Sequence, residues 1–399
     1  MNPNLPSKFL ILFVVLFFFL TVTPTFAENP VSVGSVKMET EAGVPGVMGD
    51  VDDTLEEEVG AEEDKKRRNW EPVIAPMPSR NSVFGWTLSV PAMLMYKPSF
   101  IQPEDRVWIS GVFGFYAENE SWGAGLLQRM SFGGDKWRVM GSLFHAEMNY
   151  KYYGIGGSNP DRYITLDQDI DLFLAEGLRR VLPNFYVGLN GVYTETAIGP
   201  KLADIDLPPG FDPDRLKASL TLATLAPRLQ YDTRDGEFYP RSGWFVDATA
   251  SFSRENFGSD LDYERYKAAA NHYHPLGENG VLASRIATQY VSGSAPFFLY
   301  PAFGQGPDLR GYQMGSYRDQ FLIAMQAEYR HRFTDRIGAV AFAGVGSVSP
   351  DFFGWDKTLG SIGAGFRWVV APKNNISLRF DIARGRDETI YYVGVGEAF

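Results

Sequence analysis

The sequence predicts an all-β fold, a transmembrane antiparallel β-barrel of about sixteen strands. The clearest observation is the segment 376–383, in which apolar residues alternate without a break with Ser377, Arg379, Asp381 and Ala383. This period of two is typical of a strand with two unlike faces. Because the polar face bears an arginine and an aspartate, we expect an interior that is wet or hydrogen-bonded rather than a packed hydrocarbon core, as in membrane barrels.

Composition supports the same fold class. Aromatic residues make up 15% of the 399 residues, glycine occurs 41 times and cysteine is absent. Aromatic girdles and bend-forming glycines are usual in barrels, and a chain without cysteine has no disulfides and no lipid-anchoring thiol. The net charge of −11 is concentrated in residues 28–64, which hold twelve acidic residues and one basic residue. The remainder is nearly neutral, so no nucleic-acid partner is expected.

The N-terminal region predicts a secretory signal followed by a tether. Lys8 precedes an apolar run over 9–22, and small residues precede position 28, so residues 1–27 are typical of a cleaved signal peptide. The run is shorter than the roughly 17–25 residues of a membrane-spanning helix, and a retained anchor is the alternative. Residues 28–69 are predicted to be a disordered acidic tether, with a cation or partner site as the alternative. The barrel is predicted to occupy 70–399.

Turn signals separate strand-like runs throughout the remainder of the chain. Long and short connections alternate, as expected when long loops lie outside the cell and short turns in the periplasm. The first strand is weakened by Pro72, Pro76 and Pro78, but an even strand number is needed to leave both chain ends in the periplasm. The predicted strands are 71–80, 83–96, 106–118, 121–132, 137–153, 162–181, 184–198, 218–233, 242–255, 263–275, 280–293, 318–334, 337–348, 360–371, 376–386 and 388–399.

Residue parity assigns a face to several strands. The row that starts at Trp244 is predicted to face lipid and the row with Asp247 to face inward. In the strand 318–334, Glu328 and Arg330 are predicted to face inward. In the strand 162–181, the apolar row is predicted to face lipid and the acidic row inward, as a hydrated wall or, alternatively, as ligands for a metal ion. The acidic row consists of Asp167, Asp169 and Asp171.

No enzymatic activity, cofactor or resident metal is predicted. The four histidines show no pairing with a serine and an acid of the kind that a catalytic triad needs. The glycines at 304 and 306 precede no helix, so they do not form a phosphate-binding loop.

Four motifs in order give the chain a family likeness. Leu309, Arg310, Gly311 and Tyr312 form a Leu-Arg-Gly-Tyr sequence in a long loop. The others are Tyr-Gly-Ile-Gly at 153–156, Tyr-Asp-Thr-Arg-Asp at 231–235 followed by a proline and Gly-Trp, and the last strands from Gly363 onward. Together they resemble the superfamily of BamA, TamA and the two-partner-secretion transporters, over about 70–399. The closing strand, which carries Tyr391, Val393, Val395 and Phe399, resembles the last strand of outer-membrane barrels.

The resemblance implies a sixteen-stranded barrel whose loop arginine enters the lumen and binds acids on neighbouring strands. Glu328 matches one such acid, and Asp381 is a further expected partner of Arg310. Where the family has an aspartate in a Phe-x-Asp-x-Gly pattern, this chain has Gly344. Glu328→Gln is therefore expected to loosen the loop, and restoring the acid with Gly344→Asp is expected to strengthen the hold enough to offset part of that loss, unless a neighbouring aromatic side chain needs the space.

The resemblance also bears on function. The tether is too short for the POTRA domains of the assembly and secretion members, which indicates a barrel-only relative of surface-antigen type. We expect an integral protein of the outer membrane of a Gram-negative bacterium that inserts or translocates proteins or lipids. The alternative is a structural protein or passive pore that has lost the insertase role. Expected partners are outer-membrane lipids, the β-barrel assembly machinery during biogenesis, and a protein or lipid client.

Overall fold

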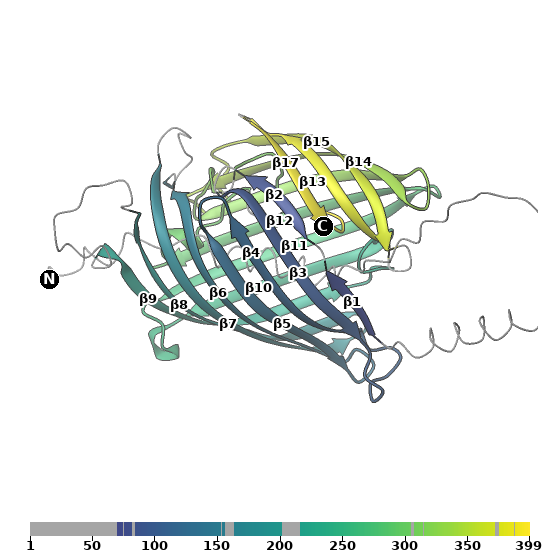
Figure 1. Ribbon diagram of the computed structural model, residues 1–399, viewed down its shortest axis with the longest axis horizontal. Helices are drawn as coiled ribbons and strands as arrows, with labels where there is room; N and C mark the ends of the chain where they lie inside the picture. Colours follow the sequence, from purple (N-terminus) through teal and green to yellow (C-terminus); the bar gives the residue numbers. More distant parts are fainter. Residues whose placement is uncertain are drawn as a thin grey trace, which may run out of the picture.

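The computed structural model describes residues 70–399 except 75, 82–83, 153, 156–162, 202–215, 305–306, 314, 372–374 and 387. The described residues form one antiparallel sheet that wraps into a barrel (Figure 1), and the predicted fold class is confirmed. Within these ranges, no helix has the length and apolar character needed to cross a membrane. The signal peptide and tether predicted at 1–27 and 28–69 lie outside the described residues.

The strands follow the predicted ranges closely because period-two segments and turn residues alternate along the chain. The short 3₁₀ helices η2 (Glu255–Phe257) and η3 (Phe297–Leu299) lie in loops. The strands are β1 (Trp70–Ile74), β2 (Met77–Asn81), β3 (Gly85–Tyr96), β4 (Trp108–Ala117), β5 (Trp122–Phe132), β6 (Trp137–Tyr152), β7 (Ile164–Leu182), β8 (Phe185–Pro200), β9 (Ala218–Asp232), β10 (Gly243–Ser253), β11 (Tyr263–Leu276), β12 (Gly280–Gly293), β13 (Phe321–Arg332), β14 (Ile337–Ser349), β15 (Leu359–Ala371), β16 (Ile376–Arg384) and β17 (Thr389–Val395).

The predicted first strand is present but interrupted. Its two segments, β1 and β2, both pair with β3, and the break between them coincides with Pro76. Proline has no N–H to donate to a ladder, which explains why the strand is discontinuous. Counted as one interrupted strand, β1 and β2 bring the barrel to the sixteen strands predicted.

The barrel closes where β17 neighbours β2, and we call this junction the seam. Its strands are short: β2 has 5 residues and β17 has 7, whereas β7 on the far wall has 19. The predicted strand 388–399 is therefore too long, because β17 ends at Val395 and Gly396 follows with a φ of 76°. Figure 1 shows β17 beside β2 and β1 alongside β3.

Exposed aromatic side chains gather near both ends of the outer wall. We call the end where β1 begins and β17 ends the terminal end, and the opposite end the loop end. Interfacial aromatic belts of this kind are usual in membrane barrels. The exposed aromatics include Trp137, Tyr231, Trp244, Tyr329 and Trp368 toward the terminal end and Trp86, Tyr116, Tyr193, Tyr266 and Tyr391 toward the loop end.

The predicted faces of β10 and β13 are confirmed, but that of β7 is wrong. Trp244 is exposed outside, and Glu328 is buried inside. In β7, Leu166 and Ile170 are buried in the interior, whereas the acidic row of Asp167, Asp169 and Asp171 is on the outer face. A membrane strand needs only about 9–11 residues. The 19-residue β7 extends beyond that length. The outer face of its first residues can therefore contact water, while the inner face packs against apolar side chains in the barrel.

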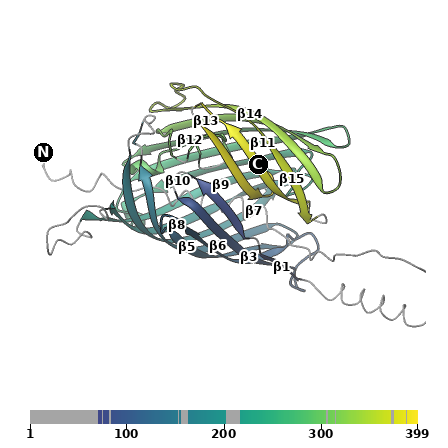
Figure 2. The same ribbon diagram turned by 45° about the horizontal axis from the view of Figure 1, so that its top comes forward.

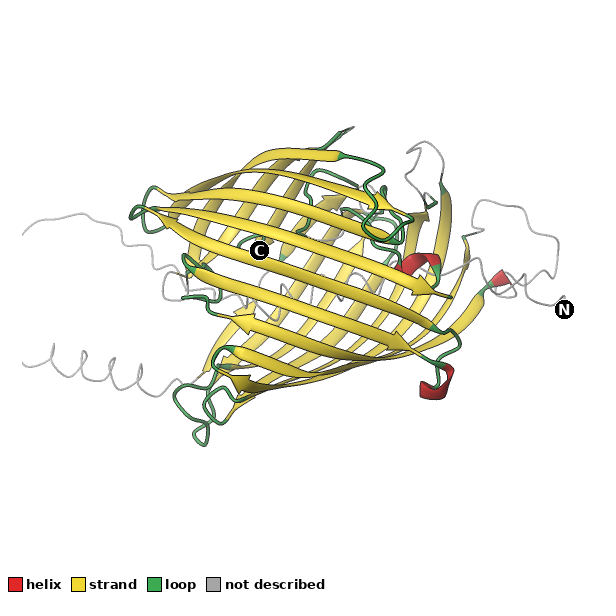
Figure 3. Cartoon of the chain, turned by 180° about the vertical axis from the view of Figure 1, so that it is seen from behind, coloured by secondary structure: helices red, strands yellow, loops and turns green. Residues whose placement is uncertain are grey.

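The expectation that the interior holds no packed apolar core is wrong at the loop end. A cluster of buried apolar side chains fills the loop end between β4 and β9, among them Phe144, Leu172 and Leu220. The loop 294–320 contributes Phe297, Phe298 and Leu299 of η3 to this cluster. Figure 3 shows both 3₁₀ helices at the same end of the barrel. Alternation along a strand assigns residues to two faces, but it does not show which of the two faces packs against an inserted loop.

Candidate functional site

The loop 294–320 lies inside the barrel and packs against β14. Leu309 and Tyr312 are buried in an apolar cluster with Phe303. A Cβ atom on Gly344 would lie 2.8 Å from Leu309 Cδ1, and one on Gly346 would lie 2.7 Å from the ring of Phe303. The two glycines thus form hollows on the inner wall that receive loop side chains, and they fix the depth of the loop.

Arg310 is held by two carboxylates. Its Nη2 donates to Glu328 of β13 at 2.5 Å, and its Nη1 donates to Asp381 of β16 at 2.7 Å. The guanidinium lies over the Phe342 ring, 3.3 Å from the centroid. Only 3% of the Arg310 side chain is exposed. Such a charge is stable in the interior only when it is paired and hydrogen-bonded.

Further contacts fix the backbone around Arg310. Ser361 donates a hydrogen bond to the Arg310 carbonyl, and the Gly311 N–H donates to the Tyr392 hydroxyl at 2.7 Å. Gly311 has a φ of 101° and lies against the backbone of Gly385, where a Cβ atom would be 2.7 Å from the Gly385 nitrogen. The glycine of the Leu-Arg-Gly-Tyr motif is therefore required both by conformation and by close approach.

The same carboxylates extend into a closed cycle of six buried charges, which we call the charge ring. The ring is neutral because it holds three arginines and three acids, and Arg367 also lies 3.9 Å from Glu328 across it. Five links measure 2.5–2.8 Å and the sixth, from Arg330 to Glu397, measures 3.8 Å. No member side chain is more than 4% exposed. In order, the ring is Arg310, Glu328, Arg330, Glu397, Arg367 and Asp381.

The C-terminal tail, residues 396–399, joins the ring because it turns into the lumen after β17. The left-handed Gly396 redirects the backbone, and Glu397 accepts a hydrogen bond from Arg367 Nε at 2.7 Å. Arg330 donates to the Phe399 carbonyl oxygen at 2.7 Å. The Phe399 ring packs against a cluster that includes Tyr239 and Tyr273. The ring therefore binds the inserted loop and the tail to the same three strands, β13, β15 and β16.

The predicted residues of the closing strand divide among three environments. Tyr391 and Val393 are exposed on the outer face. Val395 is buried in an apolar cluster at the seam that includes Met77 and Met93. Phe399 lies inside the lumen rather than on the strand.

Arg310 has two carboxylate partners although position 344 is a glycine. Asp381 supplies a second carboxylate from β16, and Leu309 occupies the space into which a side chain at 344 would project. The expectation that Gly344→Asp would strengthen the loop is therefore reversed, although the obstructing neighbour is aliphatic rather than aromatic. Sequence reasoning missed Arg367 and Glu397. Arg367 offered one signal, its period-two position on the inward face of β15, which identifies a face but not a contact. Glu397 offered none, because it has the same parity as the outward-facing Tyr391 and Val393 and enters the lumen only through the turn at Gly396.

A second network of charges closes the terminal end. Arg106 contacts Asp135, Asp232 and Glu237 at 3.1–3.5 Å. Asp135 lies in the turn between β5 and β6, outside the strands. Burial opposes its ionisation, but hydrogen bonds from Arg138 outweigh burial and hold the pKa of the Asp135 carboxyl well below its usual range. Among the described residues, no three His, Asp or Glu side chains gather as metal ligands.

The first testable prediction concerns the tail. Glu397→Gln removes one negative charge and leaves Arg367 and Arg330 with an uncompensated positive charge. We expect the tail to leave the lumen at a cost of about 1.5–3 kcal/mol to the closed state. The measurement is removal of Phe399 by carboxypeptidase from the folded barrel, which should accelerate at least tenfold. Glu278→Gln, in an exposed turn at the same end, is the control and should leave the rate unchanged.

Comparisons with known proteins agree with this architecture. The family model described as the Omp85 superfamily domain matches residues 129–399. No curated protein matches the sequence. Three similar solved structures share the fold at low sequence identity. CdiB from Escherichia coli has a TM-score of 0.56 and 13% identity, and the match covers 89% of this chain and 72% of that chain. BamA from Haemophilus ducreyi lacking POTRA domains 1–3 has a TM-score of 0.53 and 14% identity over 85% of this chain and 78% of that chain, and CdiB from Acinetobacter baumannii has a TM-score of 0.53 and 11% identity over 82% of this chain and 60% of that chain.

Proposed function

Since the chain belongs to the Omp85 superfamily, we propose that it is an outer-membrane barrel that inserts or translocates a protein or lipid client through its seam. The observation that carries the proposal is the seam itself. The two strands that meet there have 5 and 7 residues, far fewer than the strands of the opposite wall. A short ladder contributes few hydrogen bonds, so the barrel opens sideways at this junction at the lowest cost.

The packing of the interior favours a client route through the seam over a route along the axis of the barrel. At the loop end, the loop 294–320 and the apolar cluster around Phe144 occupy the lumen. At the terminal end, Tyr239 and Phe399 pack inside. A passive pore needs an aqueous path between the two ends. The seam offers a client a route that does not require these contacts to be dismantled first.

The test is a disulfide across the seam. Met77 and Val395 pack in the same apolar cluster, and the chain has no cysteine of its own. In cells that depend on this protein, Met77→Cys with Val395→Cys is expected to impair growth and change outer-membrane composition under oxidising conditions, because the seam is locked. Reductant should restore both.

A second disulfide is the matched control. Ala341 and Ala364 are directly paired on β14 and β15, away from the seam. Cysteines at these two positions should crosslink without effect. Normal growth and membrane composition with a fully formed Met77–Val395 disulfide would instead favour the structural or passive-pore role.

A further inference from the structure

Three aromatic residues form a row across one wall of the barrel at the loop end. Tyr266 of β11 pairs with Tyr290 of β12, and Tyr290 pairs with Phe321 of β13. These strands are neighbours in the sheet and lie side by side in Figure 2. Paired residues of adjacent strands point to the same face, so the three rings share one face and one height on the barrel.

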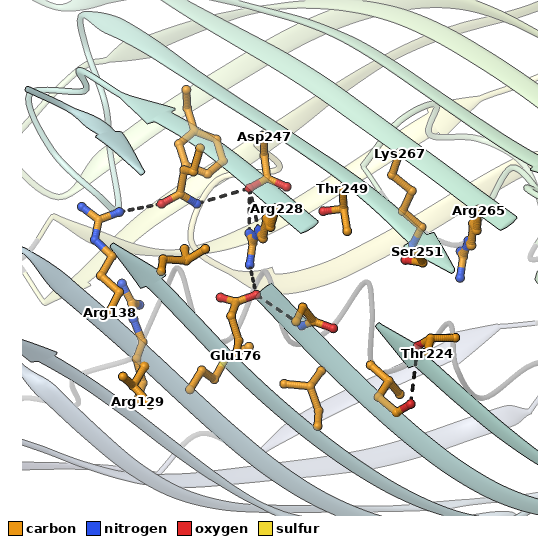
Figure 4. Close-up of a pocket in the computed structure, with 18 of the residues that line it drawn as sticks. Arg129, Arg138, Glu176, Thr224, Arg228, Asp247, Thr249, Ser251, Arg265 and Lys267 are labelled. Carbon is orange, nitrogen blue, oxygen red and sulfur yellow. Dashed lines mark hydrogen bonds and ion pairs between the residues drawn. The ribbon is translucent and has the colours of Figure 1, made fainter. Parts of the chain in front are cut away.

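The face that bears this row is the outer one. In β10, Asp247 faces the lumen, where Arg228 joins it to Glu176 beside a cavity of about 190 Å³ (Figure 4). Phe252 lies five residues further along β10, so it faces the opposite side. Its ring is 6.2 Å from that of Tyr266. The aromatic row therefore lies on the outside of the barrel.

The β14–β15 loop, residues 350–358, folds outward over this row. The Phe352 ring lies 4.9 Å from the ring of Tyr290 and 5.6 Å from that of Phe321. The Phe353 ring lies 5.5 Å from that of Phe321. Phe321 is consequently only 1% exposed although it faces outward. The loop thus leaves β14 and crosses β13 to reach β12 on the outer surface.

The loop covers the row but exposes large rings of its own. Phe352 is 57% exposed, Phe353 is 70% exposed and Trp355 is 44% exposed. Phe353 also has a φ of 59°, a left-handed conformation that is rare for a bulky side chain. Three large apolar side chains exposed together in one short loop indicate a surface that another apolar body covers.

Hydrogen bonds within the loop hold these rings in place. The Gly354 N–H donates to the Asp351 carbonyl oxygen at 2.9 Å. The Trp355 indole N–H donates to the Thr358 hydroxyl at 2.8 Å. Because the indole donor is already paired, the Trp355 ring can enter a less polar layer without leaving an unsatisfied N–H.

We propose that the loop 350–358 is a membrane anchor, which inserts the rings of Phe352, Phe353 and Trp355 into the headgroup layer of the bilayer at the loop end. The partner is a lipid surface because the loop continues the apolar outer wall. Ile286 of β12 and Met325 of β13 are paired below the row and are both exposed outward. Outward apolar bands of this kind contact lipid in membrane barrels.

Polar groups beside the row define the depth of the anchor. The Tyr266 hydroxyl donates to Glu264 at 2.6 Å, and Glu264 also pairs with Arg254 at 2.5 Å. These charges lie on the loop side of the row, whereas Ile286 lies on the other side. Irregular backbone does not contact lipid within the hydrocarbon layer, so the loop belongs at the boundary, where aromatic rings gather. This placement does not depend on opening of the seam.

The experiment measures the depth of a probe on the loop. The chain has no cysteine, so Phe353→Cys and, separately, Trp355→Cys can each carry one nitrobenzoxadiazole fluorophore on the full-length barrel. The labelled barrels are reconstituted in phosphatidylcholine vesicles. We expect stronger quenching by phosphatidylcholine with a nitroxide on its headgroup than by phosphatidylcholine with a nitroxide at the end of an acyl chain.

The matched control is Glu120→Cys in the β4–β5 turn at the same end. Glu120 shares the left-handed conformation of Phe353, with a φ of 71°, and its side chain is 77% exposed. Its probe should stay in water. Iodide on both sides of the membrane should therefore quench the two anchor probes about fivefold less than the control probe. Heat-dependent gel mobility verifies folding, and if Phe353→Cys does not fold, Trp355→Cys decides.

Three results would overturn the anchor. Iodide quenching of both anchor probes as strong as that of the control would place the loop in water. Stronger quenching from the chain end than from the headgroup would place the loop in the hydrocarbon layer. Probes shielded from iodide and from both nitroxides, but uncovered when the protein is diluted with excess lipid, would show that a second copy of the chain covers the loop instead of lipid.

Discussion

Glu328→Gln is expected to destabilise the folded barrel by about 3–5 kcal/mol, because it removes the acid that all three arginines of the charge ring contact. Glu328 is fully buried and contacts Arg310 at 2.5 Å and Arg330 at 2.8 Å. A glutamine fits the same space but leaves the ring with a net positive charge. The measurements are the midpoint of thermal unfolding and the rate at which protease cleaves the loop 294–320. Both should change together, since the loop is held through Arg310.

Two further variants make this result specific. Glu264→Gln breaks a partly exposed ion pair with Arg254 and should cost only about 0–1 kcal/mol. The double variant Glu328→Gln with Arg330→Gln restores neutrality in the ring, so it should recover part of the lost stability. If the double variant is less stable than the single one by the full cost of a second buried substitution, the charges do not act as one unit.

Gly344→Asp is expected to expel the loop rather than to strengthen its hold. A Cβ atom at this position would lie 2.8 Å from Leu309 Cδ1 and 2.9 Å from the Met325 carbonyl oxygen, and a backbone atom cannot move aside. Overpacking of this kind costs about 1–3 kcal/mol. A displaced loop should give larger and steadier single-channel conductance in planar bilayers and faster protease cleavage within 294–320.

The control for this variant is a glycine with free space. Gly360 lies at the start of β15, and a Cβ atom there would have no neighbour within 4 Å. Gly360→Asp should leave conductance and cleavage at wild-type values. Gly344→Ala, which adds the Cβ atom alone, should have an intermediate effect. Conductance in Gly344→Asp that stays at the wild-type value would show that Leu309 yields to the new side chain and that the hollow does not position the loop.

Local sequence patterns were enough to predict the strands of the barrel, because each strand is specified by its own sequence. Period two and turn residues located β3 to β16 to within a few residues. The break between β1 and β2 was marked by Pro76, but whether it interrupts the strand depends on the pairing with β3. The inward face of β7 depends on η3, which arrives from a loop more than a hundred residues later. No property of β7 alone could reveal it.

The site was predictable only in part, for a related reason. A family motif pointed to Arg310, Glu328 and Asp381, and the structure brings these three side chains together. Arg367 and Glu397 complete the ring through a register across strands and a backbone turn at Gly396.

The contact of Glu397 with distant strands bears on the order of folding. The ring cannot close until the tail reaches Arg367, 30 residues earlier in the chain. Before that moment, the three arginines of the ring face only two acids, and the interior holds an excess positive charge that opposes compaction. Contacts between distant segments are slow to form because loop closure precedes any gain. Docking of the tail therefore completes a neutral ring, which in turn holds the inserted loop through Arg310.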